Sequence, residues 1–154
     1  MISSFESILA RDGKLVYKTH GVSMEPMLRQ NRDLVIIEVP ASRLKKYDVA
    51  LYKRGKQYVL HRVIDARDGY YLIRGDNTYV LERVPDAAVL GVLTGFKRKG
   101  RDWSVNDPAY VRYVRFWCAI YPARAVFARL YRWARAVARR LGLKKWLRPG
   151  KKEA

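Results

Sequence analysis

The strongest constraint on the fold is a series of six short runs rich in Val, Ile, Leu and Tyr, separated by Gly, Pro, Asn and Asp. Apolar runs bounded by turn residues predict β-strands. No helix-length periodic segment separates them, which favours antiparallel β structure over alternating βαβ units. The predicted strands are residues 15–19, 34–39, 49–53, 57–64, 70–74 and 89–97, with hairpin turns at Arg54-Gly55 and Asp68-Gly69.

The sequence period changes after Pro122. Apolar residues there recur at three- and four-residue intervals, and Arg132, Arg135 and Arg139 fall on the opposite side, which predicts an amphipathic basic helix ending near Gly142. A short helix is also predicted at residues 3–10. A chain of 154 residues has room for one domain with an appendage. We therefore predict a mainly β domain at 1–109 and a basic helical extension at 110–154.

The charge is large and uneven. The formal net charge is +18, and residues 110–154 contain 13 basic residues and one acid, so +12 of the excess lies in this segment. Such a segment is expected to meet a polyanionic partner: a membrane face, nucleic acid or an acidic peptide. The single cysteine, Cys118, excludes an internal disulfide and a multi-cysteine metal site. No metal ion or organic cofactor is expected.

Two features of the chain bear on its location. Residues 1–11 lack a basic region followed by an apolar run, so no secretory signal is predicted. No stretch of about 18 apolar residues, the length of a membrane-spanning helix, occurs in the chain. We therefore expect a cytoplasmic protein that is either free or peripheral at the inner face of the membrane.

The sharpest local feature is the segment Gly21-Val22-Ser23-Met24-Glu25-Pro26, directly after a predicted strand. Glycine before and proline after a small hydroxyl residue predict a constrained turn that presents the serine. A serine hydroxyl needs a nearby base to act as a nucleophile. Nothing orients His20, whereas His61 lies inside a predicted strand that can hold it rigidly. Ser23 is therefore the candidate nucleophile and His61 the candidate general base.

Two acids follow the candidate base. Asp76 lies in the turn-like segment Arg74-Gly75-Asp76-Asn77, and Glu82 follows it. A histidine base gains from a carboxylate that fixes its tautomer and stabilises the imidazolium. Asp76 also fits a turn residue that bonds its own backbone, and Glu82 also fits a solvated surface acid. Both remain candidates for the acid that orients His61.

Four segments of the chain stand out in order: Gly21 to Pro26, Leu44-Lys45-Lys46-Tyr47-Asp48-Val49-Ala50-Leu51-Tyr52, Val59-Leu60-His61-Arg62-Val63-Ile64 and Gly75-Asp76-Asn77. Together they resemble the ordered boxes of type I signal peptidases over roughly residues 17–97. Four boxes in order are far more specific than any one motif. The histidine in the third box places the resemblance with the Ser-His branch, because the usual bacterial enzymes have lysine there.

The resemblance implies an antiparallel β signal-peptidase-like core and a serine endopeptidase. Ser23 would form the acyl-enzyme, His61 would be the base, and the branch's two acids fall on Asp76 and on Glu82, where the family usually has Asp. The expected substrate is a leader or signal-like peptide with small residues before the cut. The backbone N–H of Ser23 is the expected oxyanion donor. Met27 departs from the small hydroxyl residue usual after the proline, and the family's amino-terminal anchor is not evident.

Two alternatives to the peptidase interpretation stay open. A self-cleaving repressor-type regulator shares the core fold and the Ser-Met box, although it uses a lysine base. A catalytically silent basic scaffold would instead bind an anionic membrane or nucleic acid. The basic helix is equally consistent with packing on the β core and with lying in a membrane interface. Nucleic acid ranks third, because the sequence contains no recognised nucleic-acid-binding motif.

Overall fold

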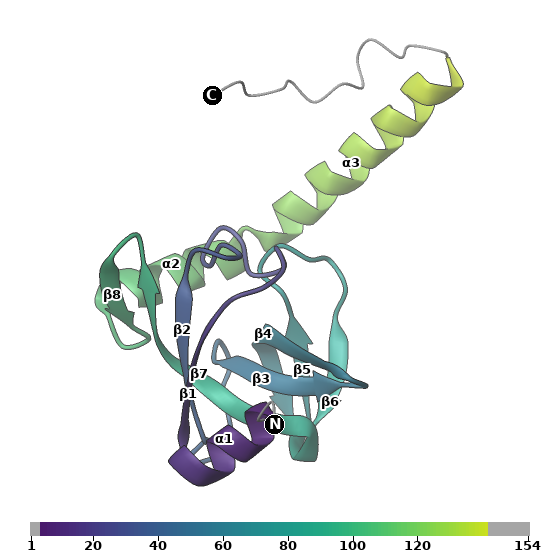
Figure 1. Ribbon diagram of the computed structural model, residues 1–154. Helices are drawn as coiled ribbons and strands as arrows, with labels where there is room; N and C mark the ends of the chain where they lie inside the picture. The colour runs from purple at the N-terminus through teal and green to yellow at the C-terminus, as the bar shows by residue number, and fades with distance from the viewer. Residues whose placement is uncertain (1–3, 142–154) are drawn as a thin grey trace. The chain divides into compact units, whose positions relative to one another are not determined.

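The computed structural model describes residues 4–141, and within them the chain is mainly antiparallel β-sheet with three α-helices (Figure 1). The last of these helices lies toward the carboxyl terminus. The elements in chain order are α1 (Phe5–Asp12), β1 (Lys14–Lys18), β2 (Leu34–Glu38), β3 (Val49–Arg54), β4 (Gln57–Arg67), β5 (Tyr70–Arg74), β6 (Glu82–Pro85), the 3-10 turn η1 (Asp86–Ala88), β7 (Val89–Arg98), β8 (Arg101–Ser104), α2 (Pro108–Ala119) and α3 (Tyr121–Arg140).

The strands form one sheet in the order β1-β2-β7-β3-β4-β5-β6, and β8 pairs with β7. Every pairing is antiparallel. The long strand β7 joins the two halves of the sheet, since it pairs with β2 through Val92–Lys97 and with β3 through Val89–Val92. The mainly antiparallel β class predicted from the sequence is therefore confirmed.

All six predicted strands are present, with ends that differ by a few residues at most. The sequence did not predict β6 and β8, because short, charged segments give little apolar signal. Of β6 only Val84 is buried, and β8 has no buried residue. One hairpin turn shifts by a residue: Arg54 pairs with Gln57, so the turn residues are Gly55 and Lys56.

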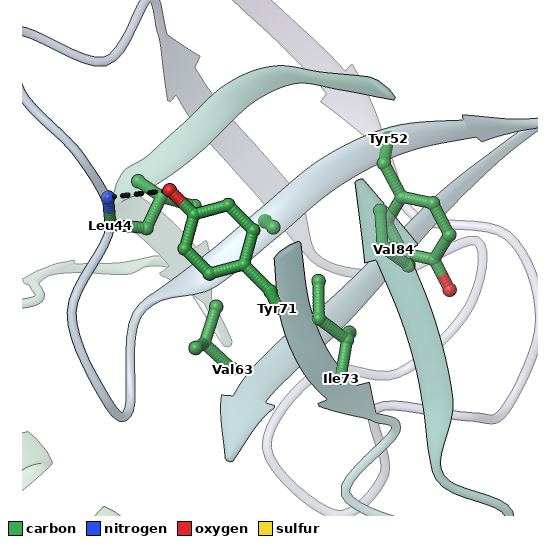
Figure 2. Packing of buried hydrophobic residues seen from close by; sticks show 7 residues of the cluster. Leu44, Tyr52, Val63, Tyr71, Ile73 and Val84 are labelled. Atoms are coloured by element: carbon green, nitrogen blue, oxygen red, sulfur yellow. Dashed lines mark hydrogen bonds between the residues drawn. The ribbon is translucent and has the colours of Figure 1, made fainter. Parts of the chain in front are cut away.

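Part of the core lies between β3, β4, β5, β6 and the segment before β3 (Figure 2). Its buried members are Leu44, Ala50, Tyr52, Val63, Tyr71, Ile73 and Val84. The Tyr71 hydroxyl accepts a hydrogen bond from the Leu44 N–H at 3.1 Å, so this ring is satisfied inside the cluster. The ring of Tyr52 belongs to the same cluster, while its hydroxyl bonds residues of the candidate site described below.

Helix α1 begins and ends at sequence signals. The Ser4 side chain accepts a hydrogen bond from the Ser7 N–H, and Gly13 closes the helix in the left-handed region at φ 66°. The predicted helix at 3–10 is thus present, displaced toward Asp12. Helix α3 corresponds to the basic amphipathic helix expected after Pro122, and its predicted end at Gly142 lies outside the described residues.

The chain divides into two compact units, one up to Phe116 and one from Trp117 onward. The boundary lies inside α2, and the predicted division at 109/110 falls in the first turn of that helix. Residues Tyr110 and Val114 of α2 are buried within the first unit. Among residues 4–141, no helix combines the length and the hydropathy needed to cross a bilayer.

Candidate active site

Ser23 lies in the loop between β1 and β2, and buried side chains fix that loop. Met24, Met27 and Leu28 follow Ser23 in the loop and are at most 5% exposed. The carboxylate of the fully buried Asp33 accepts a hydrogen bond from the Arg29 N–H at 2.9 Å, which holds the far side of the loop. The half-buried Ser23 is therefore presented by a rigid segment, as the glycine and proline around it suggested.

The segment Gly75-Asp76-Asn77 docks against the serine loop. The Asn77 N–H donates to the Ser23 carbonyl at 2.7 Å. A Cβ atom added at Gly75 would lie 2.7 Å from that carbonyl, 3.1 Å from the Ser23 Cβ and 3.1 Å from His61 Nε2. The serine side chain and the imidazole nitrogen thus border one small space, which stays open because residue 75 is glycine.

His61 lies in β4, and the register of the β3–β4 pair decides its neighbours. His61 is opposite Ala50, so Tyr52 is its diagonal neighbour on the same face, and Arg54 follows on that face. His61 is only 5% exposed. The imidazole is therefore held in a largely dry position by side chains of the adjacent strand.

Glu82 and Tyr52 contact the inner nitrogen of the imidazole. His61 Nδ1 lies 3.3 Å from Glu82 Oε1 and 3.2 Å from the Tyr52 hydroxyl. That hydroxyl donates to Glu82 Oε2 at 3.0 Å, so both groups offer an acceptor to Nδ1. We assign the imidazole proton to Nδ1 for this reason, which leaves Nε2, on the Ser23 side, as the acceptor.

Burial lowers the pKa of His61 below its ordinary value of 6.5. The charge of Glu82 opposes this shift, the Arg54 guanidinium adds to it, and the charge of Asp76 opposes it through space. Arg54 Nη1 also donates to Glu82 Oε2 at 3.0 Å, so it neutralises part of that carboxylate. The result is an imidazole that is neutral at pH 7 and ready to accept a proton.

Asp76 makes a different set of contacts. Both of its carboxylate oxygens accept hydrogen bonds from Arg62 at 2.7 Å, and both side chains are almost wholly buried. Arg62 follows His61 in β4 and points to the opposite face. Its guanidinium also donates to the Tyr47 carbonyl and the Tyr110 hydroxyl, and it lies 3.0 Å from Met27 Sδ. This pair therefore ties the Gly75 turn to β4, to the serine loop and to α2.

Ser23, His61 and Glu82 line one cleft of about 820 Å³ in the first unit. Half of the side chains around it are apolar or aromatic: Phe5, Tyr17, Met24, Leu28, Tyr58, Val59, Leu60 and Val80. Gly21, in the same loop as Ser23, also borders it. Such a lining can bury apolar groups of a ligand next to polar side chains that bind or react with it.

A scan of protein-family models matches none of them to this chain, and a search of curated proteins finds no similar sequence. Of the four predicted site residues, three line the cleft, and Asp76 is bound to Arg62 beside it.

Sequence reasoning missed Tyr52, Arg54 and Arg62 as parts of this site. Tyr52 and Arg62 occur in the segments that carry the resemblance, but nothing in their spacing says that they contact Glu82 and Asp76. The strand register supplies the missing signal for Tyr52 and Arg54, since it places them on the His61 face. Met27 is 1% exposed and packs on Arg62, so its side chain belongs to the interior.

Proposed function

We propose that this protein is a serine endopeptidase of signal-peptidase type, with Ser23 as nucleophile and His61 as general base. The observation that carries the proposal is that the Ser23 side chain and His61 Nε2 border the same space at Gly75. Ser23 Oγ attacks the peptide carbonyl while Nε2 takes its proton. The Nδ1–H bond toward Glu82 and Tyr52 then stabilises the imidazolium.

The remaining steps use the same groups. The protonated imidazole gives its proton to the leaving amine, and a water molecule, deprotonated by His61, releases the acyl group from Ser23. The Ser23 N–H is the donor proposed for the oxyanion. The apolar cleft binds the extended substrate, which by the resemblance is a leader or signal-like peptide with small residues before the cut.

Labelling with a fluorophosphonate probe tests the proposal without knowledge of the substrate. The full chain should be labelled, Ser23→Ala should not, and His61→Ala should be labelled at least about 100-fold more slowly, because the base is lost. Ser42→Ala, at an exposed serine outside the cleft, is the matched control and should match the unchanged chain. Equal labelling of all four proteins would exclude the enzyme, and spontaneous shortening of the chain would favour the self-cleaving regulator.

The two charges next to His61 should shift the pH dependence of labelling in opposite directions. The labelling rate should rise with pH as His61 loses its proton, and this rise is the acid limb of the pH profile. Arg54 lowers the pKa of His61, so Arg54→Gln should raise that pKa and move the acid limb to higher pH. Glu82 raises the pKa, so Glu82→Gln should move the limb to lower pH. Glu82→Gln should also reduce the plateau rate by about 100-fold, because the imidazolium loses its partner.

The labelling rate constant, followed between about pH 5 and 8, measures both shifts. Arg67→Gln removes the same charge from an exposed pair with Asp65 on the same strand, and it should leave the limb in place. A limb that moves in the same direction in Arg54→Gln and Glu82→Gln would show that His61 is not the titrating base.

A further inference from the structure

Helix α3 carries a pattern of charge and apolar surface that the peptidase chemistry does not use. It contains six alanines, which favour helix formation, and no acidic residue. None of its residues is buried. Its basic residues are Arg124, Arg129, Arg132, Arg135, Arg139 and Arg140.

Four of the six arginines lie on the face of α3 opposite its apolar side chains, and Arg129 and Arg140 flank the apolar face beside Trp133. At 100° per residue, Leu130, Trp133 and Val137 share one face, and Arg132 and Arg139 lie at the centre of the other. The apolar face is open: Leu130 is 55% exposed, Trp133 67% and Phe127 72%. Helix α3 therefore presents an apolar stripe on one face and, on the other, a basic stripe that contains no acidic side chain.

An anionic lipid surface matches both faces at once. Acyl chains accept the Leu, Val, Phe and Trp side chains, and headgroup phosphates pair with the arginines. A nucleic acid would engage the arginines but leave the apolar stripe without a partner. A spanning arrangement is ruled out for α3, because it lacks the hydropathy to cross a bilayer.

We propose that α3 lies in the plane of an anionic bilayer, with its apolar stripe among the acyl chains and its arginines at the phosphates. This inference does not depend on the peptidase function, and it makes the chain a peripheral membrane protein. A Trp at the apolar face and Tyr131 at its edge suit the boundary between acyl chains and water.

Flotation of the full chain with vesicles tests the proposal. Vesicles of phosphatidylcholine with a third of phosphatidylglycerol should bind the chain at least about tenfold more strongly than phosphatidylcholine alone. Arg132→Gln with Arg139→Gln should lower binding to the anionic vesicles by about tenfold or more. Leu130→Gln with Trp133→Gln should lower it by about tenfold or more as well, because the apolar stripe loses its centre.

Lys45→Gln with Lys99→Gln is the matched control, since it removes two exposed charges from the first unit, and it should change binding by less than about threefold. Equal binding to both vesicle types would overturn the proposal. The proposal would also be overturned if Arg132→Gln with Arg139→Gln reduced binding and Leu130→Gln with Trp133→Gln did not. That is the result expected of a nucleic-acid surface. Absence of binding would overturn it too, and would favour packing of α3 on protein.

Discussion

Asp76→Asn is expected to lower the free energy of unfolding by about 3–5 kcal/mol, because it leaves the buried Arg62 guanidinium without its counter-charge. Arg62 is 0% exposed and Asp76 6%. A surface ion pair would tolerate the loss, since water replaces the missing partner. Here the charge sits among Met27, Tyr47 and Tyr110, so the neutral amide cannot compensate it. Denaturant unfolding of the full chain measures the change.

Asp86→Asn makes the same chemical change in an exposed pair. Asp86 bonds Arg43 with both side chains well exposed, so the expected cost is less than about 1 kcal/mol. If Asp76→Asn were as stable as the unchanged chain and instead moved the acid limb of the labelling rate, Asp76 would be the orienting acid. The assignment of Glu82 to that role would then be wrong.

Gly75→Ala is expected to reduce the labelling rate of Ser23 by about 100-fold or more, because a Cβ cannot fit between the serine loop and the imidazole. That Cβ would lie 2.7 Å from the Ser23 carbonyl oxygen. The carbonyl oxygen is a backbone atom, so it cannot move away by a change of side-chain rotamer. The turn must therefore move away, which strains the Asn77 hydrogen bond and displaces Ser23 from His61. A misplacement of about 1 Å costs on the order of 100-fold in rate. We also expect Gly75→Ala to lower the free energy of unfolding by about 1–3 kcal/mol.

Gly69→Ala provides the matched comparison. Gly69 has φ 75° in the β4–β5 hairpin turn, where alanine is strained by about 1 kcal/mol, and it does not line the cleft. It should lower stability and leave the labelling rate of the folded protein unchanged. If labelling dropped equally in both variants, unfolding would explain the loss of labelling in Gly75→Ala. The argument that Ser23 and His61 border one space would then fail.

Most of the sheet could be predicted because its strands carry their signal locally. The strands that were found have apolar runs bounded by turn residues, as in β2, where Val35 and Ile37 alternate with half-buried neighbours. The strands that were missed, β6 and β8, gain their hydrogen bonds from β5 and β7 rather than from their own composition. No local pattern indicates such an edge strand.

The candidate site shows the same division. The sequence alone proposed Ser23 and His61, since a glycine-to-proline turn and a strand histidine are local features that the resemblance put in order. It left the acid open between Asp76 and Glu82, because both follow the base at plausible distances along the chain.

Tertiary structure separated the two acids. The pleat of β4 sends His61 and Arg62 to opposite faces, so Asp76 meets the guanidinium and Glu82 meets the imidazole. The sequence by itself determined the candidate residues, Ser23, His61 and the two acids. Which face each side chain occupies, and therefore which acid touches His61, depends on strand register and on contacts between segments distant in the chain.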